Sequence, residues 1–209
     1  MSERASIADA TLYLVAPAHL DTSDLADLIP ELASAGVDIV QLREKDLEAG
    51  DILRLAEPIL DACRGAGIPF ILNDRPDLAA TLGADGVHVG QNDLPVDATR
   101  ALIDDALVGL STHARSEIDA AAGAAPDYIA VGPVFDTPTK PGRPGVGFGL
   151  LRYAAETITL PWFAIGGIDR ATLDDVMEAG ATRIVVVRAI TEAADPVAAA
   201  AALKQQLQG

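Results

Sequence analysis

The stretch Ala179-Gly180-Ala181-Thr182-Arg183-Ile184-Val185-Val186-Val187-Arg188 contains the pattern that decides the fold. Small residues stand where a helix should end, and an apolar run follows them. A run of valine and isoleucine without polar interruption is typical of a strand that is covered on both faces, as in a parallel sheet. The stretch therefore predicts a passage from a helix into a buried parallel strand.

The same passage occurs three more times, at residues 35–40, 83–87 and 124–129, which makes a weak internal repeat. In all, eight apolar runs are spaced along the chain, and amphipathic, alanine-rich segments follow most of them. The segments have helical spacing, as in Leu25, Leu28, Ile29 and Leu32, or in Leu53, Ala56, Ile59 and Leu60. The runs are residues 11–16, 37–43, 69–74, 86–91, 107–112, 128–134, 162–167 and 183–188.

Eight strand–helix units in 209 residues predict an α/β fold, a (β/α)8 TIM barrel that forms a single domain over residues 1–209. The alternative is an open, doubly wound sheet. No glycine-rich dinucleotide fingerprint follows the first strand, which disfavours that alternative. No low-complexity stretch or linker divides the chain.

The composition excludes several classes of function. A formal net charge of −16 argues against a nucleic-acid partner, because phosphate backbones require a basic surface. An acidic protein that binds an anionic small molecule must gather its few cations locally. The three lysines are therefore informative: we expect Lys204 to be a solvated charge on the last helix, and Lys45 and Lys140 to serve the ligand.

The chain shows no sign of secretion or of a membrane partner. Its one cysteine, Cys63, excludes an internal disulfide, and we expect a small buried thiol there. The first ten residues lack the apolar centre of a signal peptide, and no apolar run is long enough to cross a bilayer. We expect a cytoplasmic protein; its oligomeric state stays open.

A proline-rich loop, Gly132-Pro133-Val134-Phe135-Asp136-Thr137-Pro138-Thr139-Lys140, follows the short apolar strand at residues 128–131. Two hydroxyls and an ammonium lie close together in it, and they suit an oxyanion such as phosphate. Prolines reduce the entropy lost when such a loop orders around a ligand. The alternative is a solvated surface loop.

Polar side chains stand at the C-terminal end of the second run, and the active site of such a barrel lies at these strand ends. Because side chains of an extended chain alternate, Gln41, Arg43 and Lys45 share one side and suit a diphosphate. The alternative is a solvated strand end at which Arg43 pairs with Glu44 or Asp46.

Two carboxylates end neighbouring runs, Asp74 after Asn73 and Asp93 after Asn92. Hard oxygen ligands beside a diphosphate are what Mg²⁺ requires, so the pair predicts a magnesium site. Taken singly, Asp74 could pair with Arg75, and Asp93 could cap the next helix.

Three further strand ends carry candidate groups. Ser111 could donate a hydrogen bond to a phosphate or a heterocycle, and His113 could be an acid–base residue or a structural one. Gly166-Gly167 at the end of the seventh run and Val187-Arg188 at the end of the eighth occupy the usual place of a monophosphate in these barrels. A glycine pair elsewhere would be a plain turn.

In combination, these motifs resemble thiamine-phosphate synthase, from the first strand to the last helix. They are QLREK (41–45), ILNDRPDLA (71–79), ADGVHVGQND (84–93), GLSTH (109–113), DYIAVGPVFDTPTK (127–140) and FAIGGI (163–168). The family joins 4-amino-2-methyl-5-(diphosphooxymethyl)pyrimidine to 4-methyl-5-(2-phosphoethyl)thiazole, in its plain or carboxylated form. Thiamine phosphate forms and pyrophosphate leaves, with CO2 as well when the thiazole is carboxylated. The resemblance thus implies a transferase of small-molecule substrates.

The resemblance also implies the roles of individual residues. Asp74 and Asp93 would bind Mg²⁺, and Arg43, Lys45, Ser111 and Lys140 would be catalytic. The substrate-binding residues would be Gln41, Leu42, Arg43, Glu44, Lys45, Asn73, Ser111, Thr137, Pro138, Thr139, Lys140, Gly167, Val187 and Arg188.

Two alternatives to the synthase are a thiazole tautomerase of related fold and a non-catalytic barrel that senses a phosphorylated ligand. A monophosphate isomerase would not need the diphosphate–magnesium set, and a sensor would be expected to lose part of it. Position 188 departs from the family, in which a serine is common there. We favour a contact between the Arg188 guanidinium and the thiazole phosphate over a contact through the backbone amide alone.

Overall fold

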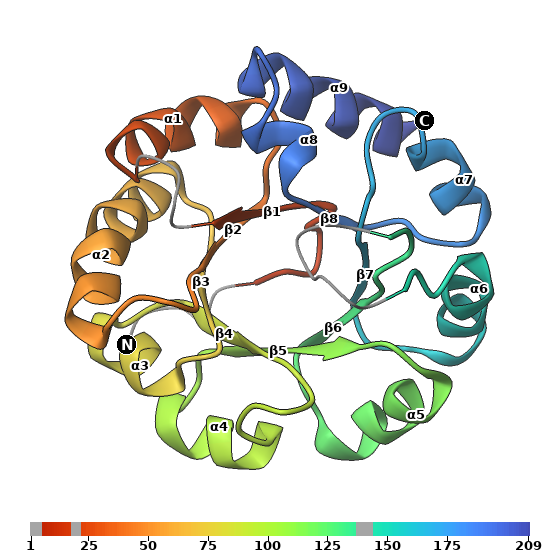
Figure 1. The fold of residues 1–209 in the computed structure, drawn as a ribbon, viewed down its shortest axis with the longest axis horizontal. Coiled ribbons are helices and arrows are strands. Elements are labelled where there is room, and N and C mark those ends of the chain that lie inside the picture. Colours follow the sequence, from red (N-terminus) through yellow and green to blue (C-terminus); the bar gives the residue numbers. More distant parts are fainter. Residues whose placement is uncertain (1–5, 18–21, 137–143) are drawn as a thin grey trace.

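The computed structural model describes residues 6–17, 22–136 and 144–209. Parallel strands follow one another around a closed ring, in which β8 pairs with β1 (Figure 1). The (β/α)8 barrel predicted from the sequence is confirmed. The strands are β1 (Leu12–Pro17), β2 (Ile39–Arg43), β3 (Phe70–Asn73), β4 (Gly86–Val89), β5 (Leu107–Thr112), β6 (Tyr128–Val131), β7 (Trp162–Ile165) and β8 (Ile184–Val186).

The helices surround this ring, and α9 lies between α7 and α1 (Figure 1). Their apolar faces point inward: Ile29 and Leu32 of α1, like Ile59 and Leu60 of α2, are almost completely buried, as their helical spacing predicts. The helices are α1 (Thr22–Ser34), α2 (Ala49–Ala66), α3 (Pro76–Leu82), α4 (Val96–Ile103), α5 (Arg115–Ala124), α6 (Phe148–Thr157), α7 (Leu173–Glu178), α8 (Arg188–Thr191) and α9 (Pro196–Gln208).

Alternate strand residues divide the core into two layers. Leu12 and Leu14 of β1 point outward into the layer between barrel and helices, whereas Tyr13 and Val15 point into the barrel interior. The interior layer also contains Phe163 of β7. Because both faces of each strand are covered, the runs read as nearly continuous apolar sequence.

The internal repeat has a structural cause. Each of the four repeats has a left-handed residue near the end of its helix: φ is 106° at Gly36, 65° at Gly83, 52° at Ala125 and 99° at Gly180. This conformation turns the chain out of the helix and toward the next strand. Glycine suits it because it carries no Cβ.

An aspartate of three repeats ties neighbouring strands together at their N-terminal ends. Asp38 before β2, Asp85 before β4 and Asp127 before β6 each accept hydrogen bonds from the start of the preceding strand. The donors are the backbone N–H groups of Thr11 (2.7 Å) and Leu12 (2.9 Å), of Phe70 (2.9 Å) and of Val108 (2.7 Å), respectively. These carboxylates therefore serve strand pairing, at the end of the barrel opposite to the chemistry.

One sequence prediction fails at this end. Lys204 of α9 is not a solvated charge: its ammonium lies 2.6 Å from Asp38 Oδ2 and donates to Thr11 Oγ1 at 2.8 Å. Its side chain is only 18% exposed. The reason is that α9 packs beside α1, which places Lys204 over the Asp38 carboxylate.

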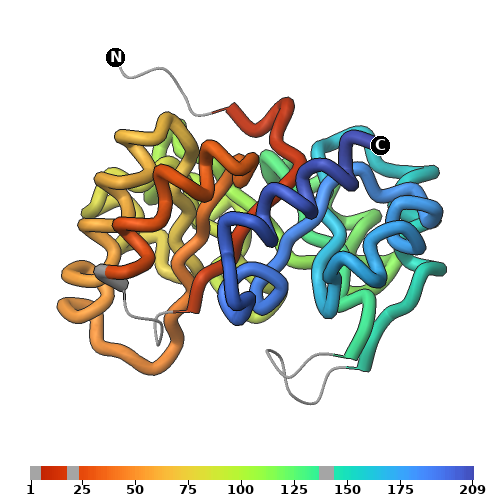
Figure 2. Tube along the Cα trace, turned by 90° about the horizontal axis from the view of Figure 1, so that it is seen from above, coloured from red at the N-terminus to blue at the C-terminus, as the bar shows by residue number. Residues whose placement is uncertain are grey.

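The N-terminal segment covers the same end of the barrel. Arg183 donates to the carbonyl oxygens of Ile7, Ala8 and Ala10 at 2.7–3.0 Å, and Ile7 and Ala10 join the interior apolar layer. Figure 2 shows this segment, in red, on the side opposite to the orange loop that joins β2 to α2. Ligands must therefore reach the interior from the C-terminal ends of the strands.

Five strands, β3, β4, β6, β7 and β8, end earlier than their apolar runs. In the run 183–188, β8 stops at Val186 because Val187 leaves the extended region (φ −122°, ψ −90°) and α8 begins at Arg188. In the run 69–74, β3 stops at Asn73, and Asp74 has a φ of 62°. The runs predicted the buried strands together with the first residues of the loops that follow them.

Candidate active site

Four of the predicted residues meet at the C-terminal mouth of the barrel. Gln41 and Arg43 of β2, Asn73 of β3 and Ser111 of β5 line one small cavity of about 50 Å³. Gln41, Asn73 and Ser111 are at least nine-tenths buried. Alternation places them there, since each occupies an inward position of its strand.

Leu42 points the other way. Its side chain is fully buried in the layer between barrel and helices. We therefore expect any contact of Leu42 with a ligand in the mouth to come from its backbone.

Glu44 shapes the turn after β2. Its Oε1 atom accepts hydrogen bonds from the backbone N–H groups of Lys45 (2.7 Å) and Asp46 (2.6 Å). Within the described residues, the structure records no ion pair between Arg43 and either Glu44 or Asp46. Arg43 instead lines the cavity.

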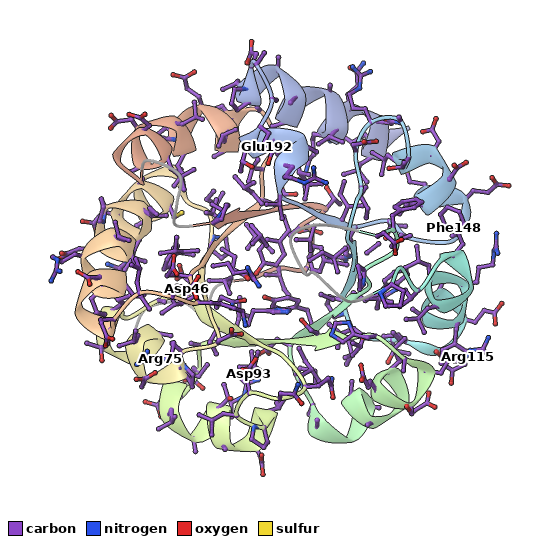
Figure 3. The ribbon with its side chains drawn as sticks, in the orientation of Figure 1. Asp46, Arg75, Asp93, Arg115, Phe148 and Glu192 are labelled. Carbon is purple, nitrogen blue, oxygen red and sulfur yellow. The ribbon has the colours of Figure 1, made fainter. Side chains whose placement is uncertain are left out.

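The two predicted metal ligands are close together. The carboxyl pKa of Asp74 is raised, first by burial and also by the neighbouring Asp93 carboxylate, while Lys45 acts in the opposite direction. Lys45 Nζ lies 2.7 Å from Asp74 Oδ2. Asp93 lies on the β4 side of the mouth (Figure 3). Two carboxylates and a cation thus stand at one edge of the mouth.

Local backbone geometry holds both carboxylates in place. Asp74 adopts the left-handed region, and its N–H donates to the His88 carbonyl at 2.8 Å. Aspartate tolerates this region better than most residues, and such strain is common at functional sites. Asp93 Oδ2 accepts from the Gly90 N–H at 2.7 Å, where a Cβ would approach it to 2.9 Å.

The structural alternatives for these two aspartates are not observed in the described residues. Arg75 pairs with Asp77 at 2.6 Å rather than with Asp74. Helix α4 has Pro95 at its N-cap, so Asp93 closes its own turn and does not cap the helix. No group of three or more histidine, cysteine or acidic side chains in the described residues could hold a metal ion.

Asn73 carries an unsatisfied donor. Its Nδ2 atom is buried and has no hydrogen-bond partner among the described residues. Buried polar groups are almost always paired, because an unpaired one costs roughly 1–3 kcal/mol. Since Asn73 lines the small cavity, this donor is a candidate contact for a ligand there.

A second, larger cavity of about 340 Å³ lies on the other side of the mouth, between β6, β7 and β8. Gly167, Val187, Arg188 and Glu192 line it, and Figure 3 shows Glu192 across the mouth from Asp93. Gly167 has a φ of 70°, and a Cβ there would meet Phe135 Cβ at 2.8 Å. Only glycine therefore fits this wall without displacing a neighbour.

Arg188 reaches this cavity but is only loosely held. Its guanidinium lies 3.9 Å from Glu192 one helical turn later, and both side chains are about half exposed. Such an exposed pair contributes little stability. The guanidinium is therefore available to an anion in the cavity.

The proline-rich loop begins at the larger cavity, which Gly132 and Pro133 line. Thr137, Pro138, Thr139 and Lys140 lie outside the described residues. On either side of them, Asp136 Oδ1 accepts from the Gly145 N–H at 2.6 Å, and the Val146 N–H donates to the Pro133 carbonyl at 2.7 Å.

His113 contacts the base of this loop. Its Nδ1 atom hydrogen-bonds to the Gly132 carbonyl, and its backbone N–H donates to Glu117 Oε2 at 2.6 Å. These contacts favour a structural role for His113 over an acid–base role.

Sequence reasoning missed three polar residues beneath the mouth, Tyr13, His88 and Tyr128. All three are buried at inward positions, where His88 hydrogen-bonds to Ser111 at 2.9 Å. The sequence contained the signal: each of these residues carries a polar group at the end of its side chain and occupies an inward-facing position of an apolar run.

Comparisons with known proteins identify the family of the chain. Residues 12–190 match the thiamine monophosphate synthase family. The thiamine-phosphate synthase of Acidothermus cellulolyticus is 49% identical over 207 residues, which cover 98% of each chain. That of Thermus thermophilus is 55% identical over 177 residues, 84% of this chain and 85% of the relative.

The chain belongs to the thiamine monophosphate synthase family. The solved thiamine phosphate pyrophosphorylase of Pyrococcus furiosus matches the barrel with a TM-score of 0.85 at 25% identity, over 95% of both chains. The sequence prediction of a thiamine-phosphate synthase, a transferase acting on small molecules, is confirmed. The comparisons favour it over the tautomerase and the sensor. No helix within the described residues has the length and apolar character needed to span a membrane.

Proposed function

We propose that the mouth of this barrel binds the pyrimidine diphosphate over the Asn73 cavity and the thiazole phosphate over the Gly167 cavity. The observation that carries the proposal is the buried, unpartnered Nδ2 donor of Asn73 among Arg43, Gln41 and Ser111. The two cavities share Ile165, Val185 and Val187, so ligands in them would lie side by side.

The charges at the mouth are distributed as a diphosphate requires. Arg43 faces the cavity, Lys45 stands beside Asp74, and the chain places Lys140 in the loop that follows β6. A guanidinium binds phosphate oxygens in a bidentate manner, and an ammonium adds a point charge. This local set of cations offsets the net charge of −16.

The donor set of Asp74 and Asp93 fits Mg²⁺. Burial and the neighbouring Asp93 carboxylate raise the pKa of Asp74, and a divalent cation between the two side chains would stabilise the charged form. Mg²⁺ is commonly held by one or two carboxylates together with waters and substrate phosphates, so no third protein ligand is needed. When bound, the ion would neutralise charge on the diphosphate.

The thiazole phosphate would lie against the backbone at Gly167 and Val187, with the Arg188 guanidinium within reach. Thr137 and Thr139 would add hydroxyl contacts from the loop. The site would thus present the thiazole nitrogen toward the pyrimidine methylene, and positioning of two reactants supplies a large share of the rate.

In the reaction, the CH2–O bond of the pyrimidine substrate breaks, and its electron pair leaves with pyrophosphate. Arg43, Lys45 and Lys140 would stabilise the charge that develops on the leaving group. The thiazole nitrogen donates its lone pair to the methylene carbon and forms the new C–N bond. Since this nitrogen is already nucleophilic, no general base is required.

The test is a pyrophosphate-release assay with an Asn73→Ala variant. We expect the KM for the pyrimidine diphosphate to rise about tenfold, because a hydrogen bond to a charged acceptor contributes roughly 1.5–3 kcal/mol. The KM for the thiazole phosphate should not change. Gln205→Ala, which removes an exposed amide on α9, is the matched control. A wild-type KM for both substrates in Asn73→Ala would refute the placement of the diphosphate substrate.

We further propose that the chain works in the cytoplasm as one domain. The single cysteine, which is buried in α2 and has no disulfide partner in the sequence, supports the compartment. The closed ring of strands from β1 to β8 supports the single domain.

A further inference from the structure

Five polar side chains cross the barrel interior as one chain of hydrogen bonds. Gln41 Nε2 donates to Tyr13 Oη at 2.5 Å, and Tyr13 Oη lies 2.9 Å from Tyr128 Oη. Tyr128 Oη lies 3.2 Å from His88 Nδ1, whose ring nitrogen Nε2 lies 2.9 Å from Ser111 Oγ. The chain thus joins β2, β1, β6, β4 and β5, and its two ends are residues of the proposed substrate cavity.

Packing fixes the geometry of this chain. The Phe163 ring packs edge-on against both tyrosines, with centroid distances of 5.5 Å to Tyr13 and 5.7 Å to Tyr128. Gly109 makes the room: a Cβ there would meet Tyr128 Oη at 2.4 Å and His88 Nδ1 at 2.5 Å. Burial raises the pKa of both tyrosines, so each hydroxyl keeps its hydrogen.

Counting hydrogens gives the chain a direction. The Gln41 amide nitrogen can only donate, so Tyr13 Oη accepts from it, and Tyr13 gives its own hydrogen to Tyr128 Oη. Tyr128 then donates to His88 Nδ1, which must be unprotonated.

The direction continues through the imidazole. With Nδ1 as an acceptor, the neutral His88 ring carries its hydrogen on Nε2 and donates it to Ser111 Oγ. A doubly protonated His88 would instead donate from Nδ1 to Tyr128, and Tyr128 would donate to Tyr13. Tyr13 Oη would then accept from both Gln41 and Tyr128, and its own hydroxyl hydrogen would have no acceptor among these five residues.

We propose that Tyr13 and Tyr128 are positioning residues that impose this direction, leaving the Gln41 carbonyl oxygen free as an acceptor and the Ser111 hydroxyl hydrogen free as a donor. The free acceptor would recognise an N–H donor such as the pyrimidine amino group, and the free donor a ring nitrogen or a phosphate oxygen. The inference rests on the proposed placement of the pyrimidine substrate over this cavity.

The first test reads the direction of the chain in the unmodified protein. In ¹⁵N-histidine NMR, the His88 signals, assigned by their loss in His88→Gln, should show a protonated Nε2 and an unprotonated Nδ1. A protonated Nδ1 in the wild-type protein overturns the proposal. This readout does not depend on how well any tyrosine variant folds.

The second test is kinetic. Tyr13→Phe and Tyr128→Phe should each raise the KM for the pyrimidine diphosphate about threefold to tenfold, as expected for loss of one neutral hydrogen bond, and leave the KM for the thiazole phosphate unchanged. Tyr128→Phe should also abolish the single His88 tautomer. The matched control is Tyr153→Phe, which removes a hydroxyl that donates to Asp119 outside the barrel, and this variant should behave as wild type.

A Gln41→Ala variant separates this inference from the proposed function. If Gln41→Ala impairs the pyrimidine substrate but both phenylalanine variants keep the wild-type KM, the positioning role is wrong and the site assignment stands. If Gln41→Ala leaves the KM unchanged, the site assignment itself fails, and this inference fails with it.

Discussion

The Lys45 ammonium lies 2.7 Å from the Asp74 carboxylate, at the point where β2 and β3 open into the mouth of the barrel. A proposed diphosphate contact and a proposed metal ligand are therefore joined in one ion pair. The Lys45 side chain is 49% exposed, whereas that of Asp74 is 18% exposed, so the ammonium can turn toward a ligand while the carboxylate stays in place.

Asp74→Asn and Asp93→Asn should each lower magnesium-dependent turnover by about 100-fold or more, because a bound metal ion contributes several kcal/mol to charge stabilisation. Asparagine keeps the left-handed backbone at position 74 accessible, so the fold should be retained. The check is turnover as a function of Mg²⁺, with circular dichroism as the control for folding. Full wild-type activity in excess chelator would remove the metal from the mechanism.

Lys140→Ala should lower kcat by about 100-fold, as expected for the loss of one charge-stabilising donor. Arg152→Ala removes an exposed charge on α6 and serves as the control. The measurement is the steady-state kcat of both variants. If Lys140→Ala and Arg152→Ala change kcat equally, the proline-rich loop is a plain surface loop.

Lys204→Ala should destabilise the protein without altering the active site. The variant removes the ammonium that contacts Asp38 and Thr11 and leaves a partly buried carboxylate short of one partner. We expect a loss of about 1–3 kcal/mol in the free energy of unfolding. Urea unfolding measures this loss, and kcat at room temperature should equal that of the wild type. An unchanged unfolding midpoint would contradict the buried ion pair.

Cys63 should resist thiol reagents in the folded protein. Burial, followed by the nearby Asp85 carboxylate, raises the pKa of the thiol to about 12, so hardly any thiolate exists at neutral pH. Iodoacetamide at mildly alkaline pH should modify the unfolded chain in urea but not the native protein, as read by mass spectrometry. Rapid labelling of the native protein would show that α2 opens readily.

Arg188→Ser should raise the KM for the thiazole phosphate about tenfold and leave that for the pyrimidine diphosphate nearly unchanged, because one charge-assisted contact contributes roughly 1.5–3 kcal/mol. Glu192→Gln, which frees the guanidinium from its 3.9 Å neighbour, should lower the same KM. Unchanged kinetics in Arg188→Ser would assign the phosphate contact to the backbone amides.

The barrel could be predicted from the sequence because its strands are buried on both faces. Because of that burial the strands appear in the sequence as apolar runs, and the left-handed helix ends at Gly36, Gly83 and Gly180 precede three of these runs. Because the strands appear as continuous apolar runs, some polar residues of the barrel interior were not recognised in the sequence. Tyr13 and Tyr128 read as ordinary strand residues, and only the three-dimensional ring brings β1 and β6 hydroxyls within 2.9 Å.

The charged residues were harder to predict than the apolar ones. Helical spacing placed Lys204 on α9 correctly but could not show that α9 packs over Asp38, since that depends on the order of elements around the ring. Asp74 and Asp93 were predicted as a pair because parallel strand ends converge at one rim. Their proximity in the structure follows from that rule.

The carboxylates of Asp38, Asp85 and Asp127 join six of the strands into three modules of two, since each links an even-numbered strand to the odd-numbered one before it. Circular permutation should respect this division. New chain ends placed between modules, in the short connections after α2 or α4, leave every carboxylate link within a continuous segment. New ends placed after α1 or α3 separate a carboxylate from its strand in the sequence. In such permutants the carboxylate and the strand that it contacts lie near opposite ends of the new chain, so their hydrogen bond must form between distant parts of the sequence.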